Sequence, residues 1–263
     1  MTAVGFIGAG RMGAPMVRRL VEHGHQVRVL GRTDERCAAM RDLGAHPVPH
    51  ATDVAEGADV VIVCVFTDEQ VQQVCLADGV AAAMRPGATL VLHTTGSPAT
   101  AREIAAKFTD IDVIDAPVSG GPHNIAAGSV TLFVGGTDDA VDTVRPVLAS
   151  YGEPILHVGA LGAGQAVKLV NNSLFAAQIG LLRTAVDLGA RLGVDEAKLL
   201  TSVLHGSGAS RVGEFVAARG SVGAFVADVG EFIGKDVEVV RRTAAELGST
   251  LGLLDQVIDA GIG

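Results

Sequence analysis

The sequence predicts an α/β domain with a parallel sheet, followed by one long helix and a C-terminal part made only of helices. Short β-branched runs alternate with amphipathic segments through roughly the first 150 residues, which is typical of strands that alternate with helices. The run Val60–Val65 is apolar throughout, as expected for a central strand buried on both faces. After Gly159 the strand signal stops, and an Ala-, Leu- and Val-rich run from Gly164 to Leu192 keeps helical spacing.

The expected strands are short runs rich in Val, Ile and Leu. They lie at Val4–Ile7, Gln26–Leu30, Asp59–Val65, Thr89–Leu92, Val113–Ile114 and Thr131–Val134. The segments between the strands place apolar side chains at helical spacing. These helices are expected at Ala14–Glu22, Glu35–Leu43, Glu69–Leu76, Ala99–Lys107 and Ala140–Ala149. Because helices connect the strands, we expect a parallel sheet that is covered on both faces.

The run from Gly164 to Leu192 predicts a helix that spans roughly 40 Å, which is long enough to link two domains. Further helices are expected at Asp195–His205, Ser210–Ala218, Asp228–Leu247 and Leu251–Ile258. We therefore expect residues 1–162 to form one domain. Residues 163–263 should form a second, all-helical domain that begins with the long helix.

Composition and charge limit the class of protein. Of the 263 residues, 48% are hydrophobic and 19% are charged, which is a globular composition with enough apolar residues for a core without disulfides. The net charge is −9 and the cationic residues are scattered, so nucleic acid is not expected as a partner. An anionic substrate therefore needs a locally positive site on this acidic chain.

The sequence also indicates a compartment. The three cysteines, Cys37, Cys64 and Cys75, are odd in number and lack metal-ligand spacing, which favours free thiols in a reducing compartment and no metal site. The chain starts directly on a strand pattern, without a charged n-region or a cleavage site. The most apolar stretch, Leu169–Leu182, is interrupted by two Asn and one Gln, so no membrane span is expected. We expect a cytoplasmic protein.

A glycine pattern follows the first expected strand and opens the first expected helix, Gly8-Ala9-Gly10-Arg11-Met12-Gly13. In this position Gly8 makes the tight turn, Gly10 lets a diphosphate approach the backbone, and Gly13 lets helix and strand pack closely. The N–H groups and the positive dipole end of the helix would then bind the phosphates. The alternative is an ordinary strand-to-helix turn, but the context favours a Rossmann-type dinucleotide-binding domain.

The end of the second expected strand bears on the choice of cofactor. An enzyme that uses NAD(H) is expected to carry an acidic residue there, which binds the ribose 2′-hydroxyl. This chain has Gly31-Arg32-Thr33, and its nearest acid is Asp34. The Arg32 guanidinium suits a 2′-phosphate, and Thr33 adds a hydroxyl donor. The pattern favours NADP(H) and leaves NAD(H) possible, since Arg32 is otherwise a solvated residue at a helix start.

Four segments together resemble the motifs of the β-hydroxyacid dehydrogenase family, which includes 3-hydroxyisobutyrate dehydrogenase and related semialdehyde reductases. They occur in the family's order across nearly the whole chain. The segments are Gly5–Gly13, Asp115-Ala116-Pro117-Val118-Ser119-Gly120-Gly121, Gly162–Asn172 and Lys235-Asp236. The resemblance implies a dinucleotide-binding domain, an interdomain helix and a helical domain that builds a homodimer or homotetramer. It also implies an enzyme that interconverts a small 3-hydroxy acid and its oxo or semialdehyde acid.

The second of these segments suits a carboxylic acid. It follows an expected strand, and the carboxyl ends of strands are where open α/β sheets bind ligands. Ser119, Gly120 and Gly121 can present a hydroxyl and successive N–H groups to a substrate carboxylate. The alternative is a glycine turn in which Ser119 caps a neighbouring segment.

Lys168 is the expected catalytic residue. It lies in the apolar part of the long helix, with Asn171 and Asn172 three and four residues later on the same face. Polar groups on a buried stripe are costly unless they serve a site. A partly desolvated Lys can donate a proton to a carbonyl oxygen and take it back during oxidation. The resemblance implies that Asn172 orients the substrate. The alternative for Lys168 is a side chain that reaches solvent at a helix start.

The resemblance also implies further contacts to the cofactor. Thr95 would lie near the nicotinamide ribose, and Val65, Phe66 and Thr67 would line the cofactor. Lys235 and Asp236 would reach the cleft only if the helical domain folds over the sheet, and Phe232 would border the nicotinamide. A solvated helix with an ordinary charged face is the alternative for these last three residues.

Two segments depart from the family pattern. Pro122-His123-Asn124-Ile125 replaces small residues after the substrate motif, and His93 stands where an acidic residue is usual. Both lie near the expected pocket and leave the substrate open. Two other functions are considered: an imine reductase-like enzyme, which typically replaces the catalytic Lys, and a non-catalytic dinucleotide-binding sensor or scaffold. The presence of Lys168 argues against both.

Overall fold

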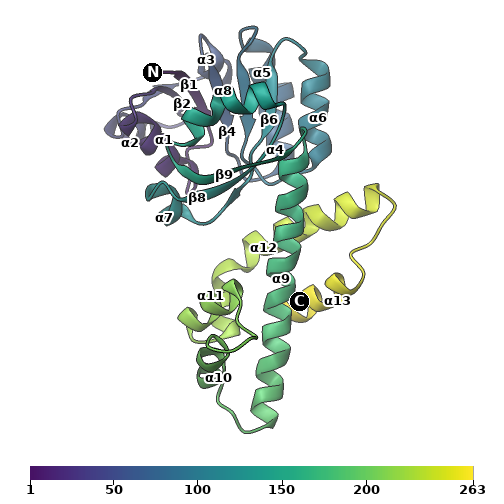
Figure 1. Ribbon diagram of the computed structural model, residues 1–263. Coiled ribbons are helices and arrows are strands. Elements are labelled where there is room, and N and C mark those ends of the chain that lie inside the picture. The colour runs from purple at the N-terminus through teal and green to yellow at the C-terminus, as the bar shows by residue number, and fades with distance from the viewer. Residues whose placement is uncertain (263) are drawn as a thin grey trace. The chain divides into compact units, whose positions relative to one another are not determined.

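The computed structural model describes residues 1–262 and divides into two compact units, Met1–Lys168 and Leu169–Gly263. The boundary between the units falls inside helix α9 (Ala163–Arg191), whose start belongs to the first unit (Figure 1). The sequence-based division was placed at residue 162, just before this helix begins.

The described strands of the first unit form a nine-stranded sheet in the order β3-β2-β1-β4-β5-β6-β8-β7, with β9 paired to β8. Strands β1 to β6 all run parallel in the order 3-2-1-4-5-6, which is the Rossmann arrangement and confirms the predicted fold class. The strands are β1 Ala3–Ile7, β2 Gln26–Leu30, β3 His46–Val48, β4 Val60–Val63, β5 Thr89–Leu92, β6 Asp112–Asp115, β7 Val118–Ser119, β8 Val130–Gly135 and β9 Gly152–Gly159.

The expected parallel pairing does not extend to one edge of the sheet. Strand β8 runs antiparallel to β6 and β7, and β9 then pairs with β8 in parallel. An antiparallel neighbour needs only a short connection, and the five-residue helix α7 (Pro122–Ala126) lies within it. Strands β3, β7 and β9 were not predicted, because β3 and β7 hold only three and two residues and β9 contains Pro154.

Helices cover both faces of this sheet. Along β4, Val60 and Ile62 belong to one buried cluster, whereas Val61 and Val63 belong to another. A strand whose alternate side chains enter two cores is buried on both faces, as its continuous apolar run predicted. The helices are α1 Gly13–Glu22, α2 Asp34–Asp42, α3 Ala51–Ala55, α4 Asp68–Gln72, α5 Val80–Ala83, α6 Pro98–Lys107, α7 and α8 Asp138–Leu148, and a π-helical segment, Gln73–Ala77, continues α4.

Helices are the only regular secondary structure among the described residues of the second unit, and turns and loops connect them. It contains most of α9, with α10 Glu196–Val203, α11 Arg211–Arg219, α12 Val222–Glu246 and α13 Leu253–Ile262. Its core gathers Ile179, Phe225 and Ile258 from three helices. A Cβ atom at Gly180 would lie 1.8 Å from the carbonyl oxygen of Val257, so α9 and α13 pack backbone to backbone there. None of the helices within residues 1–262 combines the length and apolar character that a membrane crossing requires.

Candidate active site

The turn after β1 is shaped by glycines that have no room for a side chain. Gly8 has φ +99°, and a Cβ atom there would lie 2.2 Å from the carbonyl oxygen of Cys64 at the end of β4. A Cβ atom at Gly13 would lie 2.2 Å from the carbonyl oxygen of Gly8. The turn and the start of α1 therefore pack directly against backbone, as the sequence pattern predicted for these two positions.

Gly10 differs from both of these glycines. It is exposed, and a Cβ atom there would meet no atom within 4 Å. The N-cap residue of α1, Met12, makes no side-chain cap, and the first turn of this helix holds no acidic residue. The positive end of the α1 dipole thus faces open space that a phosphate can approach. These residues fit the diphosphate of a dinucleotide.

A hollow lies beside the end of β2. Arg32 is exposed beside a hollow of about 390 Å³. This hollow is lined by Leu30, Arg32, Pro49, His50, Ala51, Thr52 and Asp78. The neighbouring Thr33 caps α2, since its hydroxyl oxygen accepts the N–H of Arg36 at 3.3 Å. A Cβ atom at Gly31 would lie 2.4 Å from Sγ of Cys37, so an acidic side chain at position 31 would require Cys37 to move.

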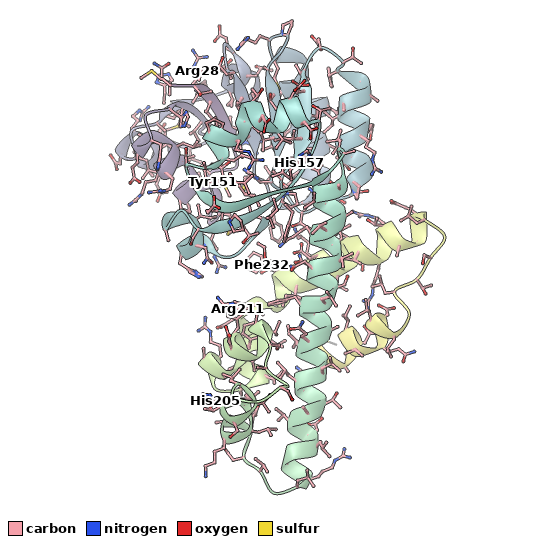
Figure 2. The ribbon with its side chains drawn as sticks, in the orientation of Figure 1. Arg28, Tyr151, His157, His205, Arg211 and Phe232 are labelled. Carbon is pink, nitrogen blue, oxygen red and sulfur yellow. The ribbon has the colours of Figure 1, made fainter. Side chains whose placement is uncertain are left out.

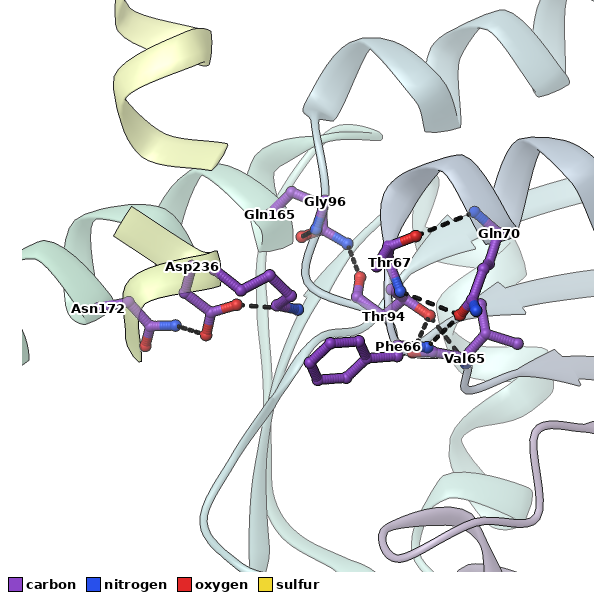
Figure 3. A network of polar contacts seen from close by, with 10 residues as sticks. Val65, Phe66, Thr67, Gln70, Thr94, Gly96, Gln165, Asn172 and Asp236 are labelled. Carbon is purple, nitrogen blue, oxygen red and sulfur yellow. Dashed lines mark hydrogen bonds and ion pairs between the residues drawn. The ribbon is translucent and has the colours of Figure 1, made fainter. Parts of the chain in front are cut away.

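Hydrogen bonds fix the loop after β4, where Val65, Phe66 and Thr67 lie (Figure 3). The N–H of Val65 donates to Thr94 Oγ1 at 3.0 Å, and the Thr94 hydroxyl donates to the carbonyl oxygen of Val65 at 3.0 Å. Gln70 Oε1 accepts the N–H groups of Phe66 and Thr67 at 2.8 and 3.2 Å. The structure therefore joins this loop to the end of β5, beside the half-buried Thr95.

His93 directly follows β5, is buried, and has one defined tautomer. Its Nδ1 lies 2.6 Å from the carbonyl oxygen of Ala116, and its Nε2 lies 2.8 Å from the hydroxyl of the fully buried Tyr151, which Figure 2 labels. A carbonyl oxygen only accepts, so Nδ1 carries the proton and the Tyr151 hydroxyl donates to Nε2. Burial lowers the pKa of His93 to about 4, so the ring stays neutral. His93 thus connects the end of β5 to the backbone after β6 and to Tyr151, and it does not act as a general acid near neutral pH.

The substrate motif forms β7 and the turn that follows it. Ser119 is half-buried and pairs with Thr131 of β8, and Gly120 has φ +136°. The N–H of Gly121 donates to Asn124 Oδ1 at 2.9 Å, so this group already has a partner. Asn124 belongs to the segment that departs from the family pattern, and here it closes the turn. Ser119 and Gly120 are therefore the better candidates for a substrate carboxylate.

Lys168 is half-buried near the start of α9. Two buried polar residues, Asp115 and Gln165, bond the start of this helix to the ends of β6 and β5. Both residues lie within the motifs that resemble the family, but no role was predicted for either of them. Each is a polar side chain within an apolar run of the sequence. This pattern could have indicated their role, because a buried polar side chain requires hydrogen-bond partners.

In the second unit, Asn172, Lys235 and Asp236 lie together, and Figure 3 labels Asn172 and Asp236. Asn172 Nδ2 donates to Asp236 Oδ2 at 2.5 Å, and the other carboxylate oxygen of Asp236 lies 3.0 Å from Lys235 Nζ. Asn172 Oδ1 accepts from Asn171 Nδ2 at 3.1 Å, which leaves one amide hydrogen and one lone pair for a ligand. Phe232 projects from α12 and is 40% exposed (Figure 2). The cofactor roles of Phe232, Lys235 and Asp236 stay predictions.

Residues 1–262 contain no cluster of three or more His, Cys, Asp or Glu side chains suited to a metal ion. Burial raises the pKa of Cys64 and of Cys75 to about 12, so neither thiol is an ionised nucleophile near neutral pH.

Two family models together match most of the chain. Residues 3–159 match the NAD binding domain of 6-phosphogluconate dehydrogenase. Residues 162–260 match the NAD-binding domain of NADP-dependent 3-hydroxyisobutyrate dehydrogenase. Both matches support a nicotinamide dinucleotide cofactor, in agreement with the glycine turn after β1.

Comparison with individual proteins supports the same family of dehydrogenases. The chain is 35% identical to human mitochondrial 3-hydroxyisobutyrate dehydrogenase over 78% of its own length and 61% of that protein's. It is 36% identical to the NAD-dependent L-serine dehydrogenase of Pseudomonas aeruginosa, over 79% and 70% of the two lengths. The solved structure of Mycobacterium tuberculosis 3-hydroxyisobutyrate dehydrogenase with L-serine matches with TM-score 0.89 and 30% identity, over 98% of this chain and 92% of that one. The chain belongs to the β-hydroxyacid dehydrogenase family, a family of nicotinamide-dependent oxidoreductases that act on CH–OH groups.

Proposed function

We propose that the protein is an NADP(H)-dependent oxidoreductase that interconverts a small 3-hydroxy acid and its oxo or semialdehyde acid, with Lys168 as the general acid and base. The observation that carries this proposal is the placement of Lys168, half-buried near the start of α9 and one helical turn before Asn172. Helix α9 is bonded at its start to the strand ends that precede Thr95 and Ser119.

Each residue in this proposal has a distinct chemical task. The nicotinamide ring, when bound, supplies or accepts the hydride. Lys168 Nζ donates a proton to the carbonyl oxygen during reduction and removes the hydroxyl proton during oxidation. Ser119 and Gly120 bind the substrate carboxylate, and the Asn172 amide orients the oxygen that gains or loses the proton. Gly8, Ala9, Gly10, Arg11, Met12 and Gly13 hold the diphosphate.

The substrate class is inferred from what two relatives share. 3-Hydroxyisobutyrate and L-serine, which name the human and P. aeruginosa relatives, are both three-carbon acid chains with a hydroxyl at C3. The chain spans about three fifths of the human relative's length, so its own substrate is a proposal.

A spectrophotometric panel tests the proposed function. NADP and NAD are paired with 3-hydroxyisobutyrate and L-serine, and NADPH and NADH with glyoxylate and with the succinic, tartronate and methylmalonate semialdehydes. Cyclic imines form a separate arm. Turnover of a hydroxy or oxo acid is expected. Turnover of imines alone would replace the proposal by an imine reductase, and cofactor binding without any turnover would favour a sensor or scaffold.

Arg32 is proposed to select NADP(H) over NAD(H). Replacing Arg32 by Ala removes the guanidinium that would pair with the 2′-phosphate, so KM for NADPH should rise about 10- to 100-fold, in line with a charge-assisted bond of about 1.5–3 kcal/mol. KM for NADH, which lacks this phosphate, should stay near its wild-type value. Steady-state kinetics with both cofactors measure the ratio.

Arg36→Ala is the matched control, because Arg36 is an exposed cation on the adjoining helix α2. It should leave both KM values unchanged. An Arg32→Ala variant that kept the wild-type preference would show that the 2′-position is recognised elsewhere.

We propose that the protein forms a homodimer or homotetramer through α9. Leu174, Leu181 and Leu188 are 48, 58 and 57% exposed and recur every seven residues. This spacing forms an apolar seam along a helix, and a second copy can pack against it with the same seam through two-fold symmetry. Leu181→Glu should lower the mass measured by light scattering. Ala190 lies on the opposite face of the helix from Leu181, so Ala190→Glu should leave the mass unchanged. If Leu181→Glu also left the mass unchanged, α9 would not form the interface between the copies.

We also propose a cytoplasmic location. The proposal is supported by Cys37, Cys64 and Cys75, which are free thiols, because free thiols persist in a reducing compartment. Fractionation of cells that express the protein at native level tests this location.

A further inference from the structure

We infer that Asp115 and Gln165 are positioning residues that fix the start of α9, and with it the proposed acid and base Lys168, against the strand ends that precede Ser119 and Thr95. The inference rests on the proposed function. Both residues act through the backbone of the helix and its neighbouring loops, and their side chains bond to backbone groups.

Asp115 anchors the helix start to the sheet. It is the last residue of β6 and is fully buried. Its Oδ1 accepts the N–H of Gly162 at 2.6 Å, and its Oδ2 accepts the N–H of Gln165 at 2.6 Å. The carboxylate thus binds two of the N–H groups that a helix N-terminus leaves without intrahelical partners. Its negative charge also lies at the positive end of the α9 dipole.

The surrounding backbone makes room for this carboxylate. A Cβ atom at Gly135, the β8 partner of Asp115, would lie 2.4 Å from Oδ1. A Cβ atom at Gly164 would lie 2.9 Å from Oδ2. Burial raises the pKa of the Asp115 carboxyl above its usual range, and the hydrogen bonds from Gly162 and Gln165 oppose this shift. Only the ionised carboxylate offers both oxygens as acceptors without placing its own proton near a donor.

Gln165 adds a second anchor to a different strand end (Figure 3). Its side chain is 3% exposed. Nε2 donates to the carbonyl oxygen of Thr94 at 2.7 Å, and Oε1 accepts the N–H of Gly96 at 3.0 Å. These two bonds flank Thr95 in the loop after β5. The Gln165 backbone is itself bonded to Asp115, so both anchors meet at one residue of α9.

The two anchors determine where Lys168 lies. Lys168 follows Gln165 by three residues, or about one turn of the helix. A rotation or shift at residues 162–165 would therefore move Lys168 relative to Ser119 and Thr95. Catalytic groups are sensitive to such shifts, because a displacement of about 1 Å can cost about 100-fold in rate.

The test compares Asp115→Asn and Gln165→Met with Asp59→Asn in the full-length chain. Asp59 is the matched control, because its carboxylate accepts the N–H of Ala3 at 2.9 Å but it directly precedes β4, at the amino ends of the parallel strands, whereas Asp115 lies at the carboxyl end of β6. The two anchor variants should exchange amide hydrogens faster at residues 162–168 and lower kcat by about 10- to 100-fold. The Kd for NADPH, whose proposed site is built on β1 and α1, should stay within about twofold of wild type. Asp59→Asn should change neither exchange at 162–168 nor kcat.

The inference would be overturned if amide hydrogens at residues 162–168 exchanged at the wild-type rate in both anchor variants. It would also be overturned if exchange became faster in these variants while kcat stayed at the wild-type value. If Asp115→Asn fails to fold, Gln165→Met decides, because it replaces an uncharged side chain of similar length. If the wild-type protein turns over none of the acids, the proposed function fails, while the exchange data still show whether the anchors hold the helix start.

Discussion

Replacing Lys168 by Met is expected to lower kcat by about 1,000-fold, because general acid–base groups contribute about 100- to 10,000-fold to a rate. Met keeps the length and apolar stem of the side chain but cannot donate a proton. NADPH binding should change by less than about twofold, since the diphosphate is proposed to lie on the turn Gly8–Gly13. Stopped-flow single turnovers measure the chemical step, and fluorescence titration measures the Kd of the cofactor.

Two further variants separate proton transfer from charge. Lys168→Arg keeps the positive charge, but a guanidinium does not give up its proton near neutral pH, so kcat should also fall. Lys198→Met removes an exposed Lys on α10 and should leave kcat unchanged. A Lys168→Met variant that kept more than a third of wild-type kcat would exclude Lys168 as the acid and base.

Alanine at Gly10 is expected to weaken NADPH binding without lowering stability. A Cβ atom at this position meets no protein atom within 4 Å, so the folded chain accommodates it. The added methyl group would lie where the diphosphate approaches the backbone, and a steric cost of about 1–3 kcal/mol would raise Kd by about 10- to 100-fold. Calorimetric titration with NADPH, together with thermal unfolding of the free protein, measures both effects.

Gly13→Ala is the informative counterpart. A Cβ atom there would lie 2.2 Å from the carbonyl oxygen of Gly8, which is backbone and cannot rotate away. This variant should lower the free energy of unfolding by about 1–3 kcal/mol. If Gly10→Ala bound NADPH as tightly as the wild type, the cofactor would not lie on this turn.

The sequence predicted the parallel strands β1, β2, β4, β5 and β6, because they are apolar runs between helical segments, but it missed the three-residue strand β3. It failed where local patterns are weak. Strand β7 has two residues, and β9 is interrupted by Pro154. Helix α12 starts at Val222, six residues before the predicted start, because Ser221 caps it by accepting the N–H of Ala224 at 3.1 Å. Gly223 weakens the helical signal over that first segment.

In the candidate site, too, the sequence predicted only the residues that belong to local patterns. The glycine turn and the Lys168 motif were found because residue types at fixed spacing carry their chemistry. Asp115 and Gln165 were missed as anchors because their partners are backbone groups 47 to 71 positions away along the chain. A backbone N–H or carbonyl leaves no residue-type signal. The pairing of His93 with Tyr151, 58 positions apart, was likewise invisible before folding.

The most direct measurement follows the hydride itself. Wild-type protein is given NADPH carrying deuterium at both C4 positions of the nicotinamide, together with each oxo acid of the panel, and the products are analysed by mass spectrometry and NMR. We expect one deuterium on the new CH–OH carbon of the preferred acid, with product formation reduced about 1,000-fold in Lys168→Met. NADPH oxidation without deuterium in the hydroxy acid, or no consumption of NADPH with any of the acids, would contradict the proposed function.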